Sequence, residues 1–183
     1  MELNILDWFQ TLHTPILDKI MTSITKLGDV GIFWIILTLL FLIIPKMRKT
    51  GIIMAAALIM DLLICNVAVK NLVARTRPYD VNTSVQLLVA KLHDYSFPSG
   101  HTAASFASVT ALYLAGEKKL WKPALVLACL IAVSRLYLYV HYPTDVLGGM
   151  VFGILAGFAG YRLVKLLEAK ISGRKNAGKQ IRR

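Results

Sequence analysis

The sequence is short of charged residues, and of acidic ones most of all. Only 17% of its 183 residues are charged, and 10 Asp and Glu residues stand against 21 Lys and Arg residues, which gives a formal net charge of +11. Hydrophobic residues make up 56% of the chain and the mean hydropathy is +0.61. Ordinary soluble domains carry about 25% charged residues, so this composition excludes that class. We therefore expect the chain to fold in a lipid bilayer.

Cysteine and low-complexity sequence are scarce as well. Cys65 and Cys129 both fall inside apolar runs, where a thiol behaves as a small hydrophobic group, so we expect neither a disulfide nor a metal site. The sequence has no internal repeat, and its one biased segment is the basic C-terminus, SGRKNAGKQIRR. The opening MELNILDWFQ is acidic and amphipathic and lacks the basic stretch of a signal peptide, so we expect no removable leader.

Apolar runs divided by short polar breaks dominate the sequence. They cover residues 16–28, 30–45, 50–72, 101–116, 121–140 and 144–167. A spanning helix needs roughly 20 residues, and the first run is the weakest candidate, which could lie in the membrane interface instead. The pattern predicts an all-α integral membrane bundle of six transmembrane helices. It also predicts a single domain over residues 1–170 and a basic cytoplasmic tail over residues 171–183.

The positive charge is concentrated in three parts of the chain. Three Lys and Arg residues lie in PKMRKT, three in EKKLWK, and eight between Arg162 and Arg183. The positive-inside rule places these segments in the cytoplasm, so the charge requires no nucleic-acid partner. We expect the break at 73–100 and the region of His141 to lie on the extracytoplasmic side. If the first helix spans, both termini should be cytoplasmic.

Polar side chains gather in three segments on the expected outer side, and polar groups among membrane helices are costly and usually functional. The segments are KNLVARTRP (70–78), FPSGH (97–101) and SRLYLYVHYPTD (134–145). They supply three cations, Lys70, Arg77 and Arg135, which suit a multiply charged oxyanion because arginine can bind phosphate through two parallel hydrogen bonds.

Ser99 and Gly100 are predicted to begin the helix that follows the second segment. The backbone N–H groups and the positive end of that helix would add to an anion site. Glycine also lets the backbone approach a ligand closely. The three segments together therefore predict a binding site for a multiply charged oxyanion.

The order and spacing of these residues resemble the three-part signature of the type 2 phosphatidic acid phosphatase superfamily. That signature is Lys, six residues and Arg-Pro; then Pro-Ser-Gly-His; then Ser-Arg, five residues, His, three residues and Asp. Every fixed position matches in order: Lys70, Arg77, Pro78, Pro98, Ser99, Gly100, His101, Ser134, Arg135, His141 and Asp145. The resemblance covers residues 70 to 145 and implies the haloperoxidase-like core of the family's membrane-bound branch.

The resemblance implies a phosphatase that works through a phosphohistidine. By position, His141 resembles the nucleophile and His101 resembles the acid that protonates the leaving oxygen. Asp145 lies four residues beyond His141, so both share one face, where the carboxylate can orient the imidazole. The expected phosphate-binding residues are Lys70, Arg77, Ser99, Gly100 and Arg135. Because these cations can stabilise the transition state, the resemblance implies no metal and no cofactor.

The expected substrate is a lipid phosphate or pyrophosphate in the outer leaflet. Polyprenyl pyrophosphate, phosphatidylglycerol phosphate and phosphatidic acid are the candidates, and membrane lipids are the other expected partners. A lipid phosphotransferase with the same intermediate and a non-catalytic anion or lipid transporter remain as alternatives. The membrane spans disfavour the soluble haloperoxidases that share the motifs, and the oligomeric state stays open.

A few conspicuous residues fall outside the signature. Arg75 has the character of an interfacial anchor, with a role in the site as the alternative. Asp61, inside an apolar run, is expected to be a neutral or hydrogen-bonded structural group. The segment SVQLLVAKLHDY (84–95) is expected to form an amphipathic lid or a surface helix. An interfacial aromatic belt is expected from Tyr137, Tyr139 and Tyr142.

Overall fold

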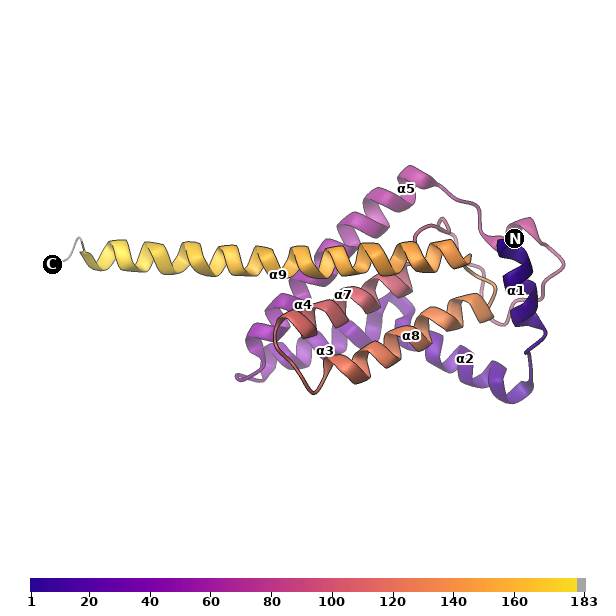
Figure 1. Cartoon of the computed structure of the whole chain (residues 1–183), viewed down its shortest axis with the longest axis horizontal. Helices are drawn as coiled ribbons and strands as arrows, with labels where there is room; N and C mark the ends of the chain where they lie inside the picture. The colour runs from indigo at the N-terminus through magenta and orange to yellow at the C-terminus, as the bar shows by residue number, and fades with distance from the viewer. Residues whose placement is uncertain (181–183) are drawn as a thin grey trace.

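The computed structural model describes the backbone of residues 1–180 and the side chains of residues 1–173 (Figure 1). Over that backbone the secondary structure is entirely helical, which confirms the predicted all-α fold. The helices in the predicted apolar runs are α2 (Pro15–Gly28), α3 (Ile32–Ile43), α4 (Arg48–Asp61), α7 (Gly100–Leu114), α8 (Trp121–Tyr137) and α9 (Pro143–Gln180). α4 continues through a π-helical stretch, η2 (Leu62–Val69), into α5 (Lys70–Val73), and the remaining short helices are α1 (Glu2–Gln10) and α6 (Pro78–Val81).

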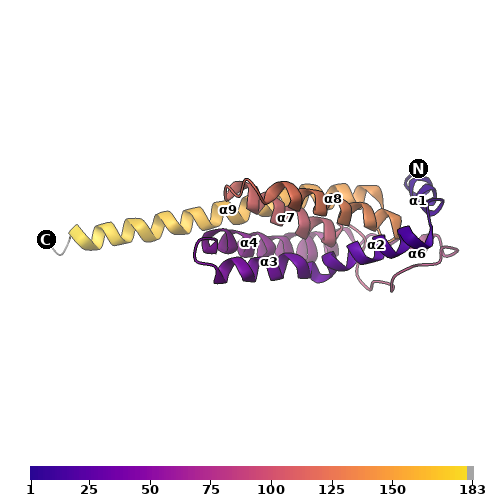
Figure 2. The same cartoon turned by 90° about the horizontal axis from the view of Figure 1, so that it is seen from below.

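The first two predicted helices lie end to end. The short 3-10 helix η1 (Asp29–Gly31) joins α2 to α3, and together they form one apolar segment, Pro15–Ile43, of 29 residues (Figure 2). The joint interrupts the helix because Val30 (φ 52°) and Gly31 (φ 69°) adopt left-handed conformations. Among the described residues, three segments are long and apolar enough to cross a membrane: Pro15–Ile43, Arg48–Val81 and Pro143–Gly173. The count of six spans is thus confirmed only in part.

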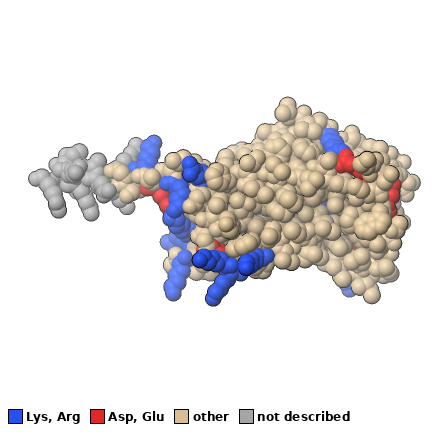
Figure 3. All heavy atoms as spheres, viewed as in Figure 1, with Lys and Arg blue, Asp and Glu red and all other residues tan. Residues whose placement is uncertain are grey.

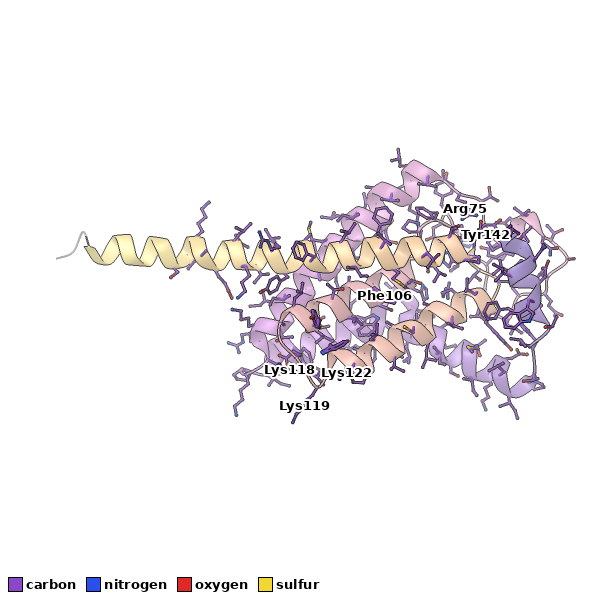
Figure 4. All side chains as sticks on the ribbon, viewed as in Figure 1. Arg75, Phe106, Lys118, Lys119, Lys122 and Tyr142 are labelled. Carbon is purple, nitrogen blue, oxygen red and sulfur yellow. The ribbon has the colours of Figure 1, made fainter. Side chains whose placement is uncertain are left out.

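Basic side chains gather at one end of the bundle. Figure 3 shows Lys and Arg concentrated at the end from which the C-terminal part of α9 projects. Lys118 and Lys119, between α7 and α8, and Lys122, in the first turn of α8, lie at this basic end, whereas Arg75 lies at the opposite end (Figure 4). The sequence segments expected to share one side therefore do so.

The N-terminus lies at the end opposite the basic residues. Glu2 Oε1 accepts hydrogen bonds from the backbone N–H (3.0 Å) and the hydroxyl (2.7 Å) of Thr144, which is in the first turn of α9. Both termini are expected at the basic end only if the first helix spans alone, and this condition is not met because α2 and α3 form one segment. They run in series and take the chain along the bundle once, whereas two antiparallel helices were expected.

Close packing of α9 on α7 brings two of the sequence motifs together. A Cβ atom at Gly149, Gly153 or Gly157 would lie within 2.7 Å of a carbonyl oxygen of α7 or of its N-cap residue, which is too close for a side chain. Small residues of this kind allow helix backbones to touch, and they are typical of membrane helix contacts. The contact fixes the start of α7 against the start of α9, where the backbone N–H of Ser99 donates to the Asp145 carbonyl (3.0 Å).

α1 covers the connection between α8 and α9. Tyr137, Tyr139 and Tyr142 are buried beneath it, with exposed fractions of 1%, 0% and 7%, so the expected interfacial belt is wrong. Two of the hydroxyl groups bind residues of the N-terminal region, since Tyr139 donates to Asp7 (2.7 Å) and Tyr137 donates to Asp18 (2.5 Å). The N-terminal segment therefore packs over the site end of the bundle.

The segment 84–95, expected as an amphipathic lid or a surface helix, contains no helix, so the second alternative is wrong and the first stays a prediction. Tertiary hydrogen bonds satisfy its backbone instead, because the Tyr79 hydroxyl accepts from the N–H of Leu92 and donates to the Leu92 carbonyl. Beyond it, the N–H of Ser96 donates to the Arg75 carbonyl. At the other end of the chain, α9 continues to Gln180, through most of the predicted tail, and residues 181–183 lie outside the described residues.

Candidate active site

Lys70 and Arg77 lie where the long rod of α4, η2 and α5 ends. The rod stops at Ala74, which is left-handed (φ 48°), and Arg77 is extended, as the following Pro78 requires. Both side chains are buried, with exposed fractions of 6% for Lys70 and 2% for Arg77. π-helical segments occur frequently at functional sites, and η2 directly precedes Lys70. The first motif therefore holds two cations inside the protein.

Both cations bind Asp94, a residue outside the predicted site. Lys70 Nζ donates to one carboxylate oxygen of Asp94, and Arg77 Nη2 donates to the other at 2.6 Å. Arg77 Nε also donates to the Asp94 carbonyl at 2.8 Å. Burial alone raises the pKa of Asp94, but its hydrogen bonds and its attraction to Lys70 and Arg77 outweigh this and lower the pKa to about 2. Asp94 is therefore ionised at neutral pH.

The second motif forms the N-terminus of α7. Ser99 is the N-cap residue and is fully buried, and its hydroxyl accepts a hydrogen bond from Thr102 (3.0 Å). Gly100 follows next to the rod, where a Cβ atom would lie 3.0 Å from Asn66 Oδ1 and 3.8 Å from Lys70 Nζ. The N-terminus of α7 thus lies next to the first cation, as an anion site requires.

His101 is held by a partner that the sequence motifs do not include. Its Nε2 lies 2.9 Å from Asp29 Oδ1, in the joint between α2 and α3. The ring also packs against the backbone of the same joint, since a Cβ atom at Gly28 would lie 2.6 Å from His101 Cδ2. The joint therefore fixes the orientation of this imidazole.

His141 lies between Arg77 and Asp145. Its Nε2 is 3.4 Å from Arg77 Nη1, and because a guanidinium only donates hydrogen bonds, Nε2 must carry a lone pair. Its Nδ1, 3.6 Å from Asp145 Oδ2, then carries the proton. Burial lowers the pKa of His141, and the charges of Arg135 and Arg77 add to this effect against the opposing influence of the Asp145 carboxylate; at 3.6 Å from that carboxylate, Nδ1 has no hydrogen-bond partner among the described residues. The imidazole is therefore neutral, with Nε2 available as a nucleophile.

Asp145 is fully buried at the start of α9 and is fixed by several donors. Its Oδ2 accepts from the backbone N–H of Tyr142 (2.9 Å) and from the Ser96 hydroxyl. Its Oδ1 accepts from Arg75 Nη1 (2.6 Å). These bonds hold the carboxylate on the side of His141 away from Arg77, which is the arrangement that orients a catalytic imidazole.

Arg135 lies behind the other cations. It is 2% exposed in the last turn of α8, where Nη1 donates to the Thr25 hydroxyl. Its Nε has no hydrogen-bond partner among the described side chains and backbone. A buried guanidinium with a free donor next to His101 and His141 is electrostatically suited to an anion.

The predicted site residues converge on one cavity of about 630 Å³. Lys70, Arg77, Gly100, His101 and His141 line it, whereas Ser99, Arg135 and Asp145 lie behind its wall. Away from the charged residues the cavity is bounded by apolar side chains, among them Ile35, Leu58, Ile59 and Leu62. Asp61 lies there too, 3% exposed and with Oδ1 lacking a partner in the described residues. The expectation that Asp61 is neutral or hydrogen-bonded stays a prediction.

The sequence motifs do not include the residues that support the site from outside. Arg75, left open between anchor and site, bridges Asp145 to Glu2 Oε2 (2.6 Å) and stacks on Tyr142 at 3.9 Å. Glu2, Asp29 and Asp94 each come from a segment far in sequence from the residue they bind. Their one visible signal is that each is an acidic residue in a chain with few of them.

A family model described as the PAP2 superfamily matches residues 50–168, a range that includes all three motifs. The chain belongs to the PAP2 superfamily. This membership confirms the resemblance drawn from the motifs, and the α4–α9 part of the bundle is the PAP2 core. The N-terminal segment with Glu2 and Asp29 lies outside the matched residues.

Known PAP2 proteins are similar to the chain over most of its length. An undecaprenyl-diphosphatase of Sulfolobus acidocaldarius is 31% identical over 147 residues, covering 80% of this chain and 70% of the relative. The crystal structure of Aquifex aeolicus LpxE has a TM-score of 0.76 and 28% identity, covering 88% of this chain and 94% of that one. The structure of a transmembrane PAP2-type phosphatidylglycerolphosphate phosphatase of Bacillus subtilis has a TM-score of 0.69 and 31% identity, covering 92% of this chain and 84% of that one.

Proposed function

We propose that this PAP2 protein is a membrane phosphatase that removes a terminal phosphate from a lipid phosphate or pyrophosphate. One observation carries the proposal. A single cavity holds His101, His141, Lys70 and Arg77 together and continues along apolar side chains. The charged part suits a phosphate group, and the apolar part suits the chain of a lipid.

In the first step His141 acts as the nucleophile. Nε2 attacks phosphorus and forms an N–P bond while the bond from phosphorus to the leaving oxygen breaks, and His101 gives its proton to that oxygen. Asp145 accepts from Nδ1 and stabilises the imidazolium that forms. Lys70, Arg77, Arg135 and the N-terminus of α7 at Ser99 and Gly100 stabilise the charge on the equatorial oxygens.

In the second step water hydrolyses the phosphohistidine. Neutral His101 takes a proton from the water while the water oxygen bonds to phosphorus. The N–P bond then breaks, and its electron pair returns to Nε2 of His141. The products are inorganic phosphate and the original enzyme. The three cations stabilise the negative charge on the phosphate oxygens, as a divalent ion does in other phosphatases. We therefore propose that no metal or cofactor is needed.

We also propose that the chain crosses the membrane several times as one domain over residues 1–170 and that the cavity opens on the extracytoplasmic side. The concentration of Lys and Arg at the opposite end supports this orientation (Figure 3), because basic residues stay on the cytoplasmic side. The apolar walls support a substrate whose tail remains in the bilayer. The names of the relatives favour polyprenyl diphosphate and phosphatidylglycerol phosphate as substrates, followed by phosphatidic acid.

Release of inorganic phosphate from lipids tests the proposal. Purified protein in detergent should release phosphate from at least one of polyprenyl diphosphate, phosphatidylglycerol phosphate and phosphatidic acid, without an added acceptor. A chelator should leave the rate unchanged. Release that requires an alcohol acceptor would identify a phosphotransferase, and anion binding without release would identify a transporter. Loss of activity with chelator and recovery with Mg²⁺ would overturn metal independence alone.

A further inference from the structure

The carboxylate of Asp94 occupies the donors that a phosphate would use. It accepts from Lys70 Nζ and Arg77 Nη2, the two cations that line the cavity. The cations belong to the protein wall, because Lys70 is 8% and Arg77 2% exposed as side chains, whereas Asp94 is 52% exposed. Removal of an oppositely charged partner from buried cations is costly. The contact therefore neutralises the site from its open side.

The segment that carries Asp94 is fixed on both sides of it. Leu92 is bound through its N–H and carbonyl to the Tyr79 hydroxyl, and the N–H of Ser96 donates to the Arg75 carbonyl. Arg77 Nε holds the Asp94 carbonyl itself at 2.8 Å. The backbone can thus stay in place while rotation of the half-exposed side chain removes the carboxylate. Exchange of a carboxylate for a phosphate needs no movement of the segment.

The two anions compete unequally for the cations. A carboxylate carries one negative charge, and a phosphodiester headgroup also carries one, whereas a terminal phosphate carries about 1.5 to 2 at neutral pH. A terminal phosphate is attracted to the two buried cations more strongly than the Asp94 carboxylate is, because it carries more negative charge. A phosphodiester carries the same single charge as the carboxylate and therefore has no such advantage. A bilayer is full of phosphodiester headgroups, so this difference discriminates between substrate and surrounding lipid.

We propose that Asp94 is a specificity residue whose carboxylate competes for Lys70 and Arg77, so that the site admits terminal phosphates and rejects monoanionic phosphodiester headgroups. The inference rests on the proposed function, because it takes Lys70 and Arg77 as the phosphate ligands. A different role for Asp94 makes the opposite prediction. If the carboxylate remains in place and holds the two cations ready for phosphate, its removal weakens anion binding.

The test measures anion binding to purified full-length protein carrying Asp94→Asn. Inorganic phosphate is titrated as an inhibitor and as a ligand that raises the melting temperature, and phosphatidylglycerol in mixed micelles is titrated as an inhibitor. The Asn variant should bind phosphate about 5-fold more tightly, the effect expected of a half-exposed ion pair. Inhibition by phosphatidylglycerol should increase by at least the same factor.

Asp80→Asn is the matched control. Asp80 lies at the same end of the bundle and pairs with Lys91 at 3.5 Å, so the variant makes the same change in net charge without touching Lys70 or Arg77. It should leave both inhibition constants unchanged, and Asp94→Glu, which keeps the charge, should stay near wild type. Asp94→Ser provides the same comparison if the Asn variant does not fold.

The sign of the change decides the question. Phosphate binding that is unchanged or weaker in the variants without the carboxylate (Asp94→Asn, or Asp94→Ser in its place), or that tightens equally in Asp80→Asn, would overturn the inference while leaving the phosphatase intact. The proposed function fails separately, if the wild-type protein releases phosphate from none of the lipid substrates. Tighter binding by Asp94→Asn or Asp94→Ser, with Asp94→Glu and Asp80→Asn near wild type, supports the competing carboxylate.

Discussion

His141 and His101 have different surroundings, and the difference matches the roles proposed for them. His141 is buried between Arg77 and Asp145, which together keep Nε2 unprotonated. His101 faces the cavity and is bound to Asp29, a carboxylate whose side chain is 56% exposed. A buried neutral imidazole suits a nucleophile, whereas the Asp29 carboxylate favours the proton that His101 needs for the leaving group, against burial and the Arg135 charge, which lower the pKa of His101.

Alanine variants of the two histidines should respond differently to the leaving group. His141→Ala should abolish turnover of every substrate, because the covalent intermediate cannot form. His101→Ala should lower kcat on a lipid monophosphate by about 10² to 10⁴, the usual contribution of a general acid. Turnover of an activated aryl phosphate by His101→Ala should be close to wild type, since phenolate leaves without a proton. Phosphate release from both substrates provides the measurement.

His93→Ala is the control for this comparison, since His93 is an exposed residue of the 82–99 segment. It should leave both rates unchanged. Rescue of His141→Ala by the aryl phosphate, with no rescue of His101→Ala, would reverse the two assignments. Equal loss on both substrates by both variants would remove the acid role from His101.

The spacing within each motif was enough to predict which side chains meet. Lys70, Arg77, His101 and His141 reach one cavity because helix periodicity and the starts of α7 and α9 put them at one end of the bundle. Asp94 and Asp29 could not be predicted in the same way. Each contacts the site through a loop or a joint, and the contact depends on tertiary packing that no local pattern encodes.

The joint between α2 and α3 shows what hydropathy alone leaves undecided. The polar break at Asp29 correctly predicts that one helix ends and another begins. The sequence of such a break does not show whether the next helix turns back or continues in the same direction. Val30, a β-branched residue at φ 52°, occupies a strained backbone conformation, which commonly marks a functional segment. The strained turn is what places Asp29 Oδ1 next to His101.

Asp29→Asn should therefore act through His101. The variant keeps the side-chain volume but removes the negative charge that favours a proton on the imidazole, so we expect kcat on a lipid monophosphate to fall about 10-fold. Turnover of the activated aryl phosphate should stay near wild type, and the melting temperature should change little because Asp29 is half-exposed. Paired kcat measurements on the two substrates, together with a melting curve, check this expectation.

Asp18→Asn, on the same apolar segment, is the matched control. Its carboxylate accepts from the Tyr137 hydroxyl and does not touch His101, so the ratio of the two rates should not change. If Asp29→Asn lowers both rates equally, the joint is structural and Asp29 does not position the acid.

The whole bundle has a direction that its charges and its N-terminus define together. Basic side chains mark one end (Figure 3), and α1, Arg75 and Tyr142 lie at the other (Figures 1 and 4). Glu2 contacts Thr144 there, and the cavity is lined by Gly100 and His141, next to the starts of α7 and α9. Because α2 and α3 run in series, the N-terminus and the described end of α9 lie at opposite ends of the bundle (Figure 1). Hydropathy suggested six separate helices, and the pairing of the first two into one segment became visible only in the fold.

Cysteine labelling of intact cells should report this direction. In a background with Cys65 and Cys129 replaced by Ala, Asn4→Cys and Ser84→Cys should react with a membrane-impermeant maleimide, since both positions are exposed at the cavity end. Lys119→Cys, exposed at the basic end, should react only after permeabilisation, because the positive-inside rule keeps that end in the cytoplasm. If Ser84→Cys is labelled in intact cells but Asn4→Cys is not, α2 and α3 cross separately and the N-terminus is cytoplasmic. If Lys119→Cys is the one labelled from outside, the bundle is inverted and the cavity faces the cytoplasm.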